Sequence, residues 1–480
     1  MFCIAFPSLC FFDNSFMVST LLVMKQVLLL SVAWCAASAS LAQTVNATAG
    51  DSGNDAIMAV SQSPDGGWMA CGRWYDTVGD HEGNLWLWKW DAAAVPVAST
   101  VHPLPHDQTP YNVISTSTGK WVAVGVEGPE DSSLPNRGLA AVFGSDAALE
   151  ATHTLSQPYA TYLFDVTETA SGELLAVGAQ NTNPDSAIWV RFNSSDLQVL
   201  EQGKWVIGEE FGAQFIEPDG NGGWYVAGGT GNELKVSHHH ADMTVLETGS
   251  IALNNGVGCH GLAVGPDGVF VAGEDRHENS TDWRAGLVRW SLDLQEAEVA
   301  YAPLTTESAT AAVLLTEEPA GGVLVGYADD AATDLWSPFA FRFSPELEWT
   351  GGGIEPISNS VIVRDAILFA DQILFAGDQF TPDQARQGWL ATGGLPLSTD
   401  DPSPSLGAAP NPTDGIVLLH ACLGATCRWF TATGVEVTER VGVLGGGRFD
   451  LNALPNGVYI ASPEPEDTSQ RIRSTRIVKM

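Results

Sequence analysis

Apolar and polar positions follow one pattern that recurs along most of the chain. Each copy starts with a polar turn, often Asp-Gly or Gly-Gly, and continues into a short apolar run that ends at a glycine. These closing glycines are Gly72, Gly125, Gly178, Gly228, Gly273, Gly326 and Gly377. Their spacing of about 50 residues is typical of repeat folds, in which every copy forms one supersecondary unit. The pattern therefore predicts seven equivalent units.

A second apolar run, rich in aromatic residues, follows the longer loop of every unit. It spans residues 85–90, 139–143, 188–192, 234–236, 287–290, 339–343 and 389–391. An apolar strand before each turn and a polar strand at the end of the unit complete a four-stranded antiparallel sheet. This sheet resembles the blade of a β-propeller. The sequence thus predicts an all-β fold with a seven-bladed β-propeller over residues 43–395. A parallel β-helix is the main alternative, but its coils are usually shorter and lack antiparallel turns.

The last unit lacks its outermost strand. After residues 389–391 the chain enters a linker rich in Pro, Ser and Asp, which we assign to 396–408. Residues 44–48 are compatible with a β-strand and have no other assignment. We expect them to complete blade seven, because this pairing would close the ring and leave no open sheet edge.

Residues 409–480 form a separate C-terminal segment. Short apolar runs separated by turns predict a small β-domain. Its distinctive positions are Pro410, Asn411, Pro412 and Gly415 at the start, Asn456, Gly457 and Tyr459 near the end, and the basic residues Arg476 and Lys479 at the terminus. The segment resembles the type A C-terminal sorting domain, a small β-sandwich, of cargo exported by the type IX secretion system of Bacteroidota. An unrelated small β-domain is the alternative.

The resemblance implies that the type IX secretion machinery recognises this domain at the outer membrane. In that family the domain is usually removed, or the cargo is tethered to surface lipopolysaccharide. We therefore expect a protein that crosses the periplasm and is then secreted or attached to the outer-membrane surface. We also expect a monomer.

The N-terminus agrees with export. Residues 27–33 are apolar and follow Lys25, and small residues precede Gln43, which predicts a signal peptide over 1–42 with an upstream extension at 1–23. The apolar stretch is shorter than the roughly 20 residues that a transmembrane anchor needs. A lipoprotein is the other alternative, but bulky Trp34 makes Cys35 a poor lipid-attachment site.

Charge and cysteine content narrow the range of partners and cross-links. The chain has 57 acidic and 21 basic residues, for a formal charge of −36, so phosphate repulsion disfavours nucleic acid. A salt-adapted host is an alternative reason for this acidity. Cys422 and Cys427 flank a hairpin loop, and we predict a disulfide between them in an oxidising compartment. Cys71 and Cys259 are expected to pack as small hydrophobic side chains.

The long loops between the second and third strands of each unit hold the candidate ligand-binding residues. These are Trp74, Tyr75, Asp76, Asp80, Glu82, Glu274, Asp275, Trp283, Tyr327, Asp329 and Trp336. Acids interleaved with aromatic residues suit sugars or Ca²⁺, which prefers oxygen ligands. The alternative is a solvated loop surface in an acidic protein. We expect no other cofactor and no dedicated metal site.

Motifs of known catalytic mechanism are absent from the sequence. We find no His-Glu-x-x-His, phosphate-binding loop or Gly-x-Ser-x-Gly element, so no catalytic residue is assigned. The run His238-His239-His240 is expected to lie exposed in a turn on the opposite face. The sequence favours a binding or adhesion module for a glycan or protein. A secreted hydrolase or lyase acting on polysaccharide or peptide is the alternative.

Overall fold

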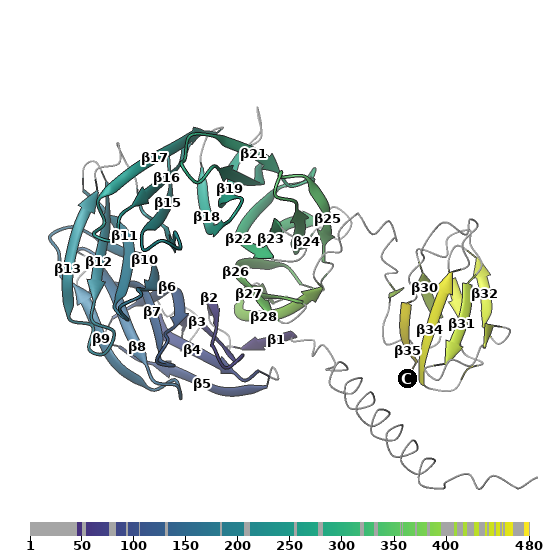
Figure 1. Ribbon diagram of the computed structural model, residues 1–480. Coiled ribbons are helices and arrows are strands. Elements are labelled where there is room, and N and C mark those ends of the chain that lie inside the picture. Colours follow the sequence, from purple (N-terminus) through teal and green to yellow (C-terminus); the bar gives the residue numbers. More distant parts are fainter. Residues whose placement is uncertain are drawn as a thin grey trace, which may run out of the picture.

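The protein is a seven-bladed β-propeller (Figure 1). The computed structural model describes residues 46–394 apart from short segments, mostly in loops, and separate short stretches between 408 and 479. Every blade is a four-stranded sheet in which neighbouring strands are antiparallel. The fold predicted from the repeat is therefore confirmed for the propeller. Within the described residues there is no α-helix, and hence none that is long and apolar enough to span a membrane.

The strands of each blade follow one another from the central axis outward. Blades one to three contain β2 (Ala56–Gln62), β3 (Trp68–Trp74), β4 (Asn84–Trp90), β5 (Pro96–His102); β6 (Gln108–Ser115), β7 (Trp121–Glu127), β8 (Arg137–Phe143), β9 (Leu149–Leu155); and β10 (Thr161–Glu168), β11 (Leu174–Gln180), β12 (Ser186–Phe192), β13 (Val199–Trp205). Blades four and five contain β14 (Phe215–Pro218), β15 (Trp224–Thr230), β16 (Glu233–His239), β17 (Val245–Ala252); and β18 (Gly258–Gly265), β19 (Gly268–Arg276), β20 (Trp283–Trp290), β21 (Ala297–Tyr301).

Blades six and seven complete the ring. Blade six contains β22 (Ser308–Thr316), β23 (Gly321–Asp330), β24 (Leu335–Phe343) and β25 (Trp349–Ile354). Blade seven contains β26 (Val361–Phe369), β27 (Gln372–Phe380), β28 (Arg386–Gly394) and, as its outermost strand, β1 (Asn46–Ala49). Asn46 pairs with Ala391 and Ala49 pairs with Gly388 in antiparallel register. The predicted closure by the N-terminal strand is confirmed, and both ends of the ring share one sheet.

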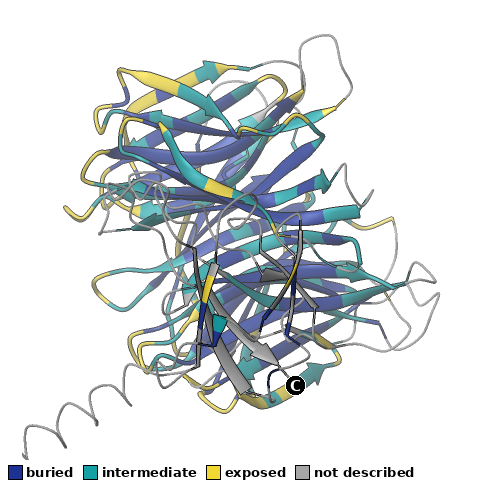
Figure 2. Cartoon of the chain, turned by 90° about the vertical axis from the view of Figure 1, so that its right-hand side faces the viewer, coloured by how far each residue is buried: buried dark blue, intermediate teal, exposed yellow. Residues whose placement is uncertain are grey.

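The hydrophobic core lies between neighbouring blades. One cluster joins the tryptophans of blade one to Leu374 and Leu390 of blade seven, and Trp68 stacks on Trp90 with ring centroids 4.6 Å apart. Figure 2 shows that buried residues follow the strands, whereas exposed ones concentrate in turns and outer strands. Cys71 and Cys259 belong to these clusters as buried free cysteines, which confirms their predicted role. Each blade is therefore held on two sides by its neighbours.

The closing glycines have a specific structural cause. In six blades the innermost strand contains a β-bulge against the second strand, at the point where the glycine sits. A Cβ atom on Gly72 would lie 2.0 Å from the carbonyl oxygen of Ala56, and one on Gly377 would lie 2.0 Å from that of Ile362. No other residue type fits this close approach of two backbones. The repeated glycine therefore permits the bulge.

A second recurring contact joins the third strand of one blade to the next blade. Arg191 donates a hydrogen bond to the carbonyl oxygen of Ala241 at 2.7 Å, and Lys89 and Arg289 make corresponding bonds to Ser145 and Pro345. The acceptor lies in the turn between the third and fourth strands. In five such turns a non-glycine residue adopts positive φ with its side chain buried: Ala147, Leu197, Met243, Leu294 and Leu347. Three of these turns, those of Ala147, Met243 and Leu347, accept the bond from the preceding blade.

The described C-terminal stretches form two small sheets. One contains β29 (Ala408–Ala409), β30 (Ile416–Leu419), β33 (Arg448–Asp450) and β32 (Gly442–Gly445), and the other contains β31 (Cys427–Thr431), β34 (Gly457–Pro463) and β35 (Thr475–Lys479). Buried Trp429 of β31 contacts Phe449 of β33, with ring centroids 5.3 Å apart.

Several sequence predictions lie outside the described residues. They concern the leader 1–42, the linker 396–408 apart from Ala408, and Pro410, Asn411, Pro412, Gly415, Asn456 and Cys422. Gly457 and Tyr459 belong to β34, and Arg476 and Lys479 belong to β35. Cys427 begins β31, but because Cys422 is not described, the predicted disulfide stays a prediction.

Candidate functional site

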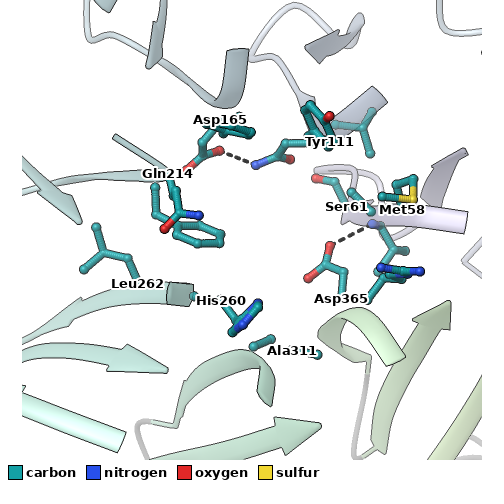
Figure 3. A pocket seen from close by; sticks show the side chains of 18 of the residues that line it. Met58, Ser61, Tyr111, Asp165, Gln214, His260, Leu262, Ala311 and Asp365 are labelled. Atoms are coloured by element: carbon teal, nitrogen blue, oxygen red, sulfur yellow. Dashed lines mark hydrogen bonds between the residues drawn. The ribbon is translucent and has the colours of Figure 1, made fainter. Parts of the chain in front are cut away.

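A cavity of about 450 Å³ lies on the axis of the ring, lined by the innermost strands of all seven blades (Figure 3). The second strand of each blade runs from the short turn towards the long loop, so its closing glycine lies towards the long-loop face. The bulge opposite this glycine therefore lies in the half of the channel nearest the long loops. The geometry of the bulge positions one side chain per blade at this level.

The seven residues at this level are chemically different although the backbone around them repeats. They are Met58, Tyr111, Phe164, Gln214, His260, Ala311 and Arg364, and all of them line the cavity. Gln214 precedes β14, which pairs with β15 without a register shift, and holds the corresponding place in blade four. We call these seven residues the bulge ring. Figure 3 shows Tyr111 and His260 on opposite sides of the cavity.

Blades five to seven form a polar wall at the bulge ring. His260 Nε2 lies 3.1 Å from Glu274 Oε1 in blade five, and Arg364 donates a 2.9 Å hydrogen bond to Asp378 Oδ2 in blade seven. In both blades the acid comes directly after the closing glycine. The residue at that place in blade six is Tyr327, and burial raises the pKa of its phenol, with the negative charge of Glu274 adding to the effect. Tyr327 therefore stays protonated at neutral pH.

Blades two and three form an aromatic wall. Tyr111 and Phe164 are neighbours in the bulge ring, with ring centroids 5.2 Å apart. Tyr162 stacks against Phe164 at 6.0 Å with an interplanar angle of 3°. Asn136 donates a 3.0 Å hydrogen bond to the Tyr162 hydroxyl, which fixes the orientation of that ring. All three aromatic side chains are only partly buried, so part of their surface is accessible.

Two buried carboxylates connect the innermost strands across blade boundaries. Asp165 Oδ2 accepts the N–H of Ile216 at 2.8 Å, linking blade three to blade four, and Asn112 of blade two donates to Asp165 Oδ1. Asp365 Oδ2 accepts the N–H of Val60 at 2.8 Å, linking blade seven to blade one. Burial raises the pKa of both carboxyls to about 7.

A third acid in the cavity lining has a similar perturbation. Burial raises the pKa of Glu217 to about 8, and the charge of Asp165 adds to this. None of these three carboxyls has an Arg or Lys among the causes of its pKa shift. In the described part of the chain no group of three or more His, Cys, Asp or Glu side chains is arranged to hold a metal ion.

The structure separates the candidate residues of the long loops into different environments. Glu274 and Tyr327 lie at the polar wall. Trp336 contacts Tyr327 edge-on, with ring centroids 5.3 Å apart. Asp329 lies in β23 together with Tyr327 and donates its N–H to the carbonyl oxygen of Glu307. The charges of Asp329 and Glu274 both contribute to the raised pKa of Glu307, although burial is the larger cause. These four predicted residues therefore belong to one region of the long-loop face.

Other candidates have structural contacts within their own blade. Trp74 packs edge-on against Trp86 at 5.4 Å, and Tyr75 is buried with its N–H donating to Asp55. Asp275 is fully buried and forms an ion pair with Arg284 at 2.6 Å.

The remaining candidates are Trp283 of blade five and three acids of the first long loop. Trp283 lies 5.1 Å from the guanidinium of Arg276 in a cation–π contact. Asp76, Asp80 and Glu82 lie outside the described residues.

The prediction that the run of three histidines is exposed is wrong for two of them. His239 is fully buried, shares a 2.7 Å hydrogen bond with Ser237 Oγ and packs against Trp205. Burial lowers the pKa of His239 to about 4. His238 is mostly covered by its stacking on Tyr225 and by Asp219 at 2.9 Å. Only His240 is exposed. The strand β16 extends to His239, so its alternating side chains turn this histidine into the core.

The sequence prediction missed all seven residues of the bulge ring, including His260 and Arg364. It also missed Asp378, whose buried carboxylate faces Arg364. The sequence signal that could have found these residues is their constant position in the repeat. Each lies on the innermost strand or directly before it, one hairpin turn before the closing glycine of the second strand. Comparing that position across the seven repeats would have shown seven different side chains in an otherwise regular pattern.

Comparison with known proteins gives matches only among solved structures. No family model matches the sequence, and no curated protein matches it. The structure called Dos1 propeller shares 9% identity over 73% of this chain and 95% of its own, with a TM-score of 0.44. Sqt1 from Chaetomium thermophilum shares 13% sequence identity over 73% of this chain and 100% of its own, with a TM-score of 0.42. A protein of unknown function from Dyadobacter fermentans shares 9% sequence identity over 74% of this chain and 100% of its own, with a TM-score of 0.45.

Proposed function

We propose that this protein is an exported binding module whose ligand, a glycan or a protein, enters the axial cavity from the long-loop face. The observation that carries the proposal is the chemical diversity of the bulge ring. Positions that serve only the fold repeat in every blade, as the closing glycines do, because each blade has the same packing problem. Seven different side chains around one cavity have no such structural reason. Concave cavities with a few convergent polar groups are the usual sites of ligand binding.

The polar wall is where affinity for a ligand is expected to concentrate. His260 and Arg364 come from blades five and seven, and between them blade six contributes only the small side chain of Ala311. The nearby acids orient these two side chains through contacts of 3.1 and 2.9 Å. Preorganised polar groups lose little entropy on binding.

The experiment that tests this proposal is a ligand screen with the mature chain. A glycan array and a pool of extracellular proteins, each with and without Ca²⁺, would be probed with the wild-type protein and with His260→Ala and Arg364→Ala. We expect the variants to lose the ligand that the wild type retains. His240→Ala, on the opposite face, is the matched control. A ligand that binds all four proteins equally well would contradict the axial site.

Export through the type IX secretion system is the second part of the proposal. It is supported by the motif residues Pro410 to Gly415 and Asn456 to Tyr459, by the basic end with Arg476 and Lys479, and by the signal-like residues 1–42. The two sheets joined at Trp429 and Phe449 agree with the β-sandwich of the sorting domains that this segment resembles. The mature protein would then be secreted or attached to the outer-membrane surface.

Export is tested in the native host. A chain lacking residues 409–480 is expected to accumulate in the periplasm, whereas the full chain reaches the medium or the cell surface. Fractionation and immunoblotting would measure this distribution. Equal surface levels of both chains would refute the sorting role.

A hydrolase or lyase acting on polysaccharide or peptide is the second candidate function. It is favoured by one observation: a histidine oriented by a carboxylate, a protonated tyrosine and an arginine converge at the polar wall. Such groups suit general acid–base chemistry. Loss of product formation in His260→Ala with retained ligand affinity would support catalysis, whereas ligand recovered unchanged from wild-type protein would exclude it for that ligand.

A further inference from the structure

The charged groups of the axial cavity leave no free countercharge for an ionic ligand. Arg364 is paired with Asp378, and Arg386 adds a second contact to the same carboxylate at 3.8 Å. His260 faces Glu274 at 3.1 Å. An anionic ligand would have to displace a carboxylate from Arg364 and would also meet the acidic side chain of Glu274 beside His260. Like charges without a partner disfavour binding strongly.

The three acids inside the cavity do not form a cation site either. Glu217 holds a proton at neutral pH, because burial raises its pKa to about 8. Asp165 and Asp365 use their oxygens to accept main-chain N–H groups of their own and the neighbouring blades. They are engaged in holding the blades together. The groups of the lining that remain available are hydrogen-bonding ones, such as the amide of Gln214 and the ring nitrogen of His260 that faces away from Glu274.

The opposite side of the cavity offers aromatic surface. Tyr111 and Phe164 stand next to each other in the bulge ring, and Tyr162 extends this surface with a ring parallel to that of Phe164. An uncharged ligand with one apolar face and several hydroxyl groups matches both walls at once. Pyranose rings have this character, because their axial C–H groups form a flat apolar face while their hydroxyls project from the edge. The volume of about 450 Å³ lies within the usual range of about 300–1,000 Å³ for small-ligand sites.

From these observations we infer that the axial cavity binds a short uncharged saccharide, stacked on Tyr111 and Phe164 and hydrogen-bonded by the polar wall of blades five to seven. This inference rests on the proposed function and specifies its ligand. The aromatic wall supplies apolar contact and orientation, and the polar wall distinguishes the hydroxyl pattern. Anionic and cationic saccharides are expected to bind weakly or not at all.

The test is calorimetric titration of the full mature chain with saccharides of three charge classes. These are neutral gluco-, manno- and xylo-oligosaccharides, oligogalacturonate as the anion, and chitosan oligomers as the cation. A neutral oligosaccharide is expected to bind best. Tyr111→Ala and Phe164→Ala are each expected to weaken it roughly tenfold or more, because an aromatic platform is removed. Tyr111→Phe keeps the ring and is expected to stay within about threefold of wild type. Tyr159→Ala is the control, since this tyrosine is 50% exposed and outside the cavity lining.

The outcomes separate this inference from the proposed function. Preferred binding of a charged saccharide, or no binding of any saccharide by folded protein, overturns the uncharged-saccharide inference. If a protein ligand then binds and His260→Ala abolishes that binding, the axial site itself stands. If a neutral saccharide binds equally to wild type, Tyr111→Ala and Phe164→Ala, the axial site is overturned as well. Thermal unfolding of each variant checks that the fold is intact.

Discussion

The carboxylate of Asp365 accepts the main-chain N–H of Val60 at 2.8 Å, although 305 positions separate the two residues in the chain. This bond joins the innermost strand of the last blade to that of the first. Together with the pairing of β1 and β28 at the outer rim, it closes the ring at both its inner and outer edges. Asp165 makes the corresponding bond to Ile216 between blades three and four.

Removing the acceptor at the inner edge is expected to destabilise the ring. In Asp365→Ala the N–H of Val60 loses its partner, which costs about 1–3 kcal/mol of unfolding free energy for a buried group. Asp365→Asn keeps an acceptor oxygen and is expected to retain more of the stability. Urea unfolding measures both. As a control, Asp146→Ala removes an exposed bond to Ala148 and should change stability by about 0.5 kcal/mol or less. Equal losses at Asp365 and Asp146 would contradict the closing role.

Removing the strand at the outer edge is a separate test. A mature chain that lacks residues 43–49 loses β1 and leaves β28 as an open edge. We expect a lower thermal unfolding temperature and a tendency to aggregate or dimerise through that edge. Differential scanning calorimetry and light scattering measure the two effects. An unchanged transition with a monomeric solution would show that β1 does not hold the ring.

The closing glycines should not tolerate a side chain. Gly377→Ala places a Cβ atom 2.0 Å from the carbonyl oxygen of Ile362, so the bulge must shift. We expect a loss of roughly 2–4 kcal/mol or failure to fold. Gly353→Ala is the matched control, because a Cβ atom there would have no other atom within 4 Å and the backbone is not in the left-handed region. That control should be neutral or slightly stabilising. Similar effects at both sites would refute the steric explanation.

The buried carboxyl of Asp165 should make stability fall as pH rises. Its pKa is raised from the ordinary value of 3.8 to about 7 in the folded protein, so the folded state holds a proton that the unfolded state loses. The stability that this proton provides is complete below about pH 4 and is lost as pH rises to about 7. Asp165→Asn lacks this dependence. As the pH rises from about 4 to about 7, the unfolding temperature of the wild type is therefore expected to fall relative to that of Asp165→Asn. Parallel pH profiles would contradict the shift.

The strand pattern was accessible from the sequence because it is local. Turn residues, strand ends and the closing glycines such as Gly72 and Gly377 recur with one period, and each reflects contacts within a single blade. The pairing of β1 with β28 was also predictable, since a missing strand at one end matched an unassigned strand at the other. The turn residues with positive φ, such as Leu197 and Leu294, were missed because sequence rules assign that conformation mainly to glycine.

The sequence by itself determined how many blades there are and where each begins, because hydrophobic periodicity and turn chemistry act over a few residues. Only the tertiary structure decided which side chains meet at the axis. His260, Arg364 and Tyr111 come from three different repeats, and no spacing rule along the chain brings them together. Closure of the ring does so, since it turns one position per repeat into seven neighbours around a common cavity.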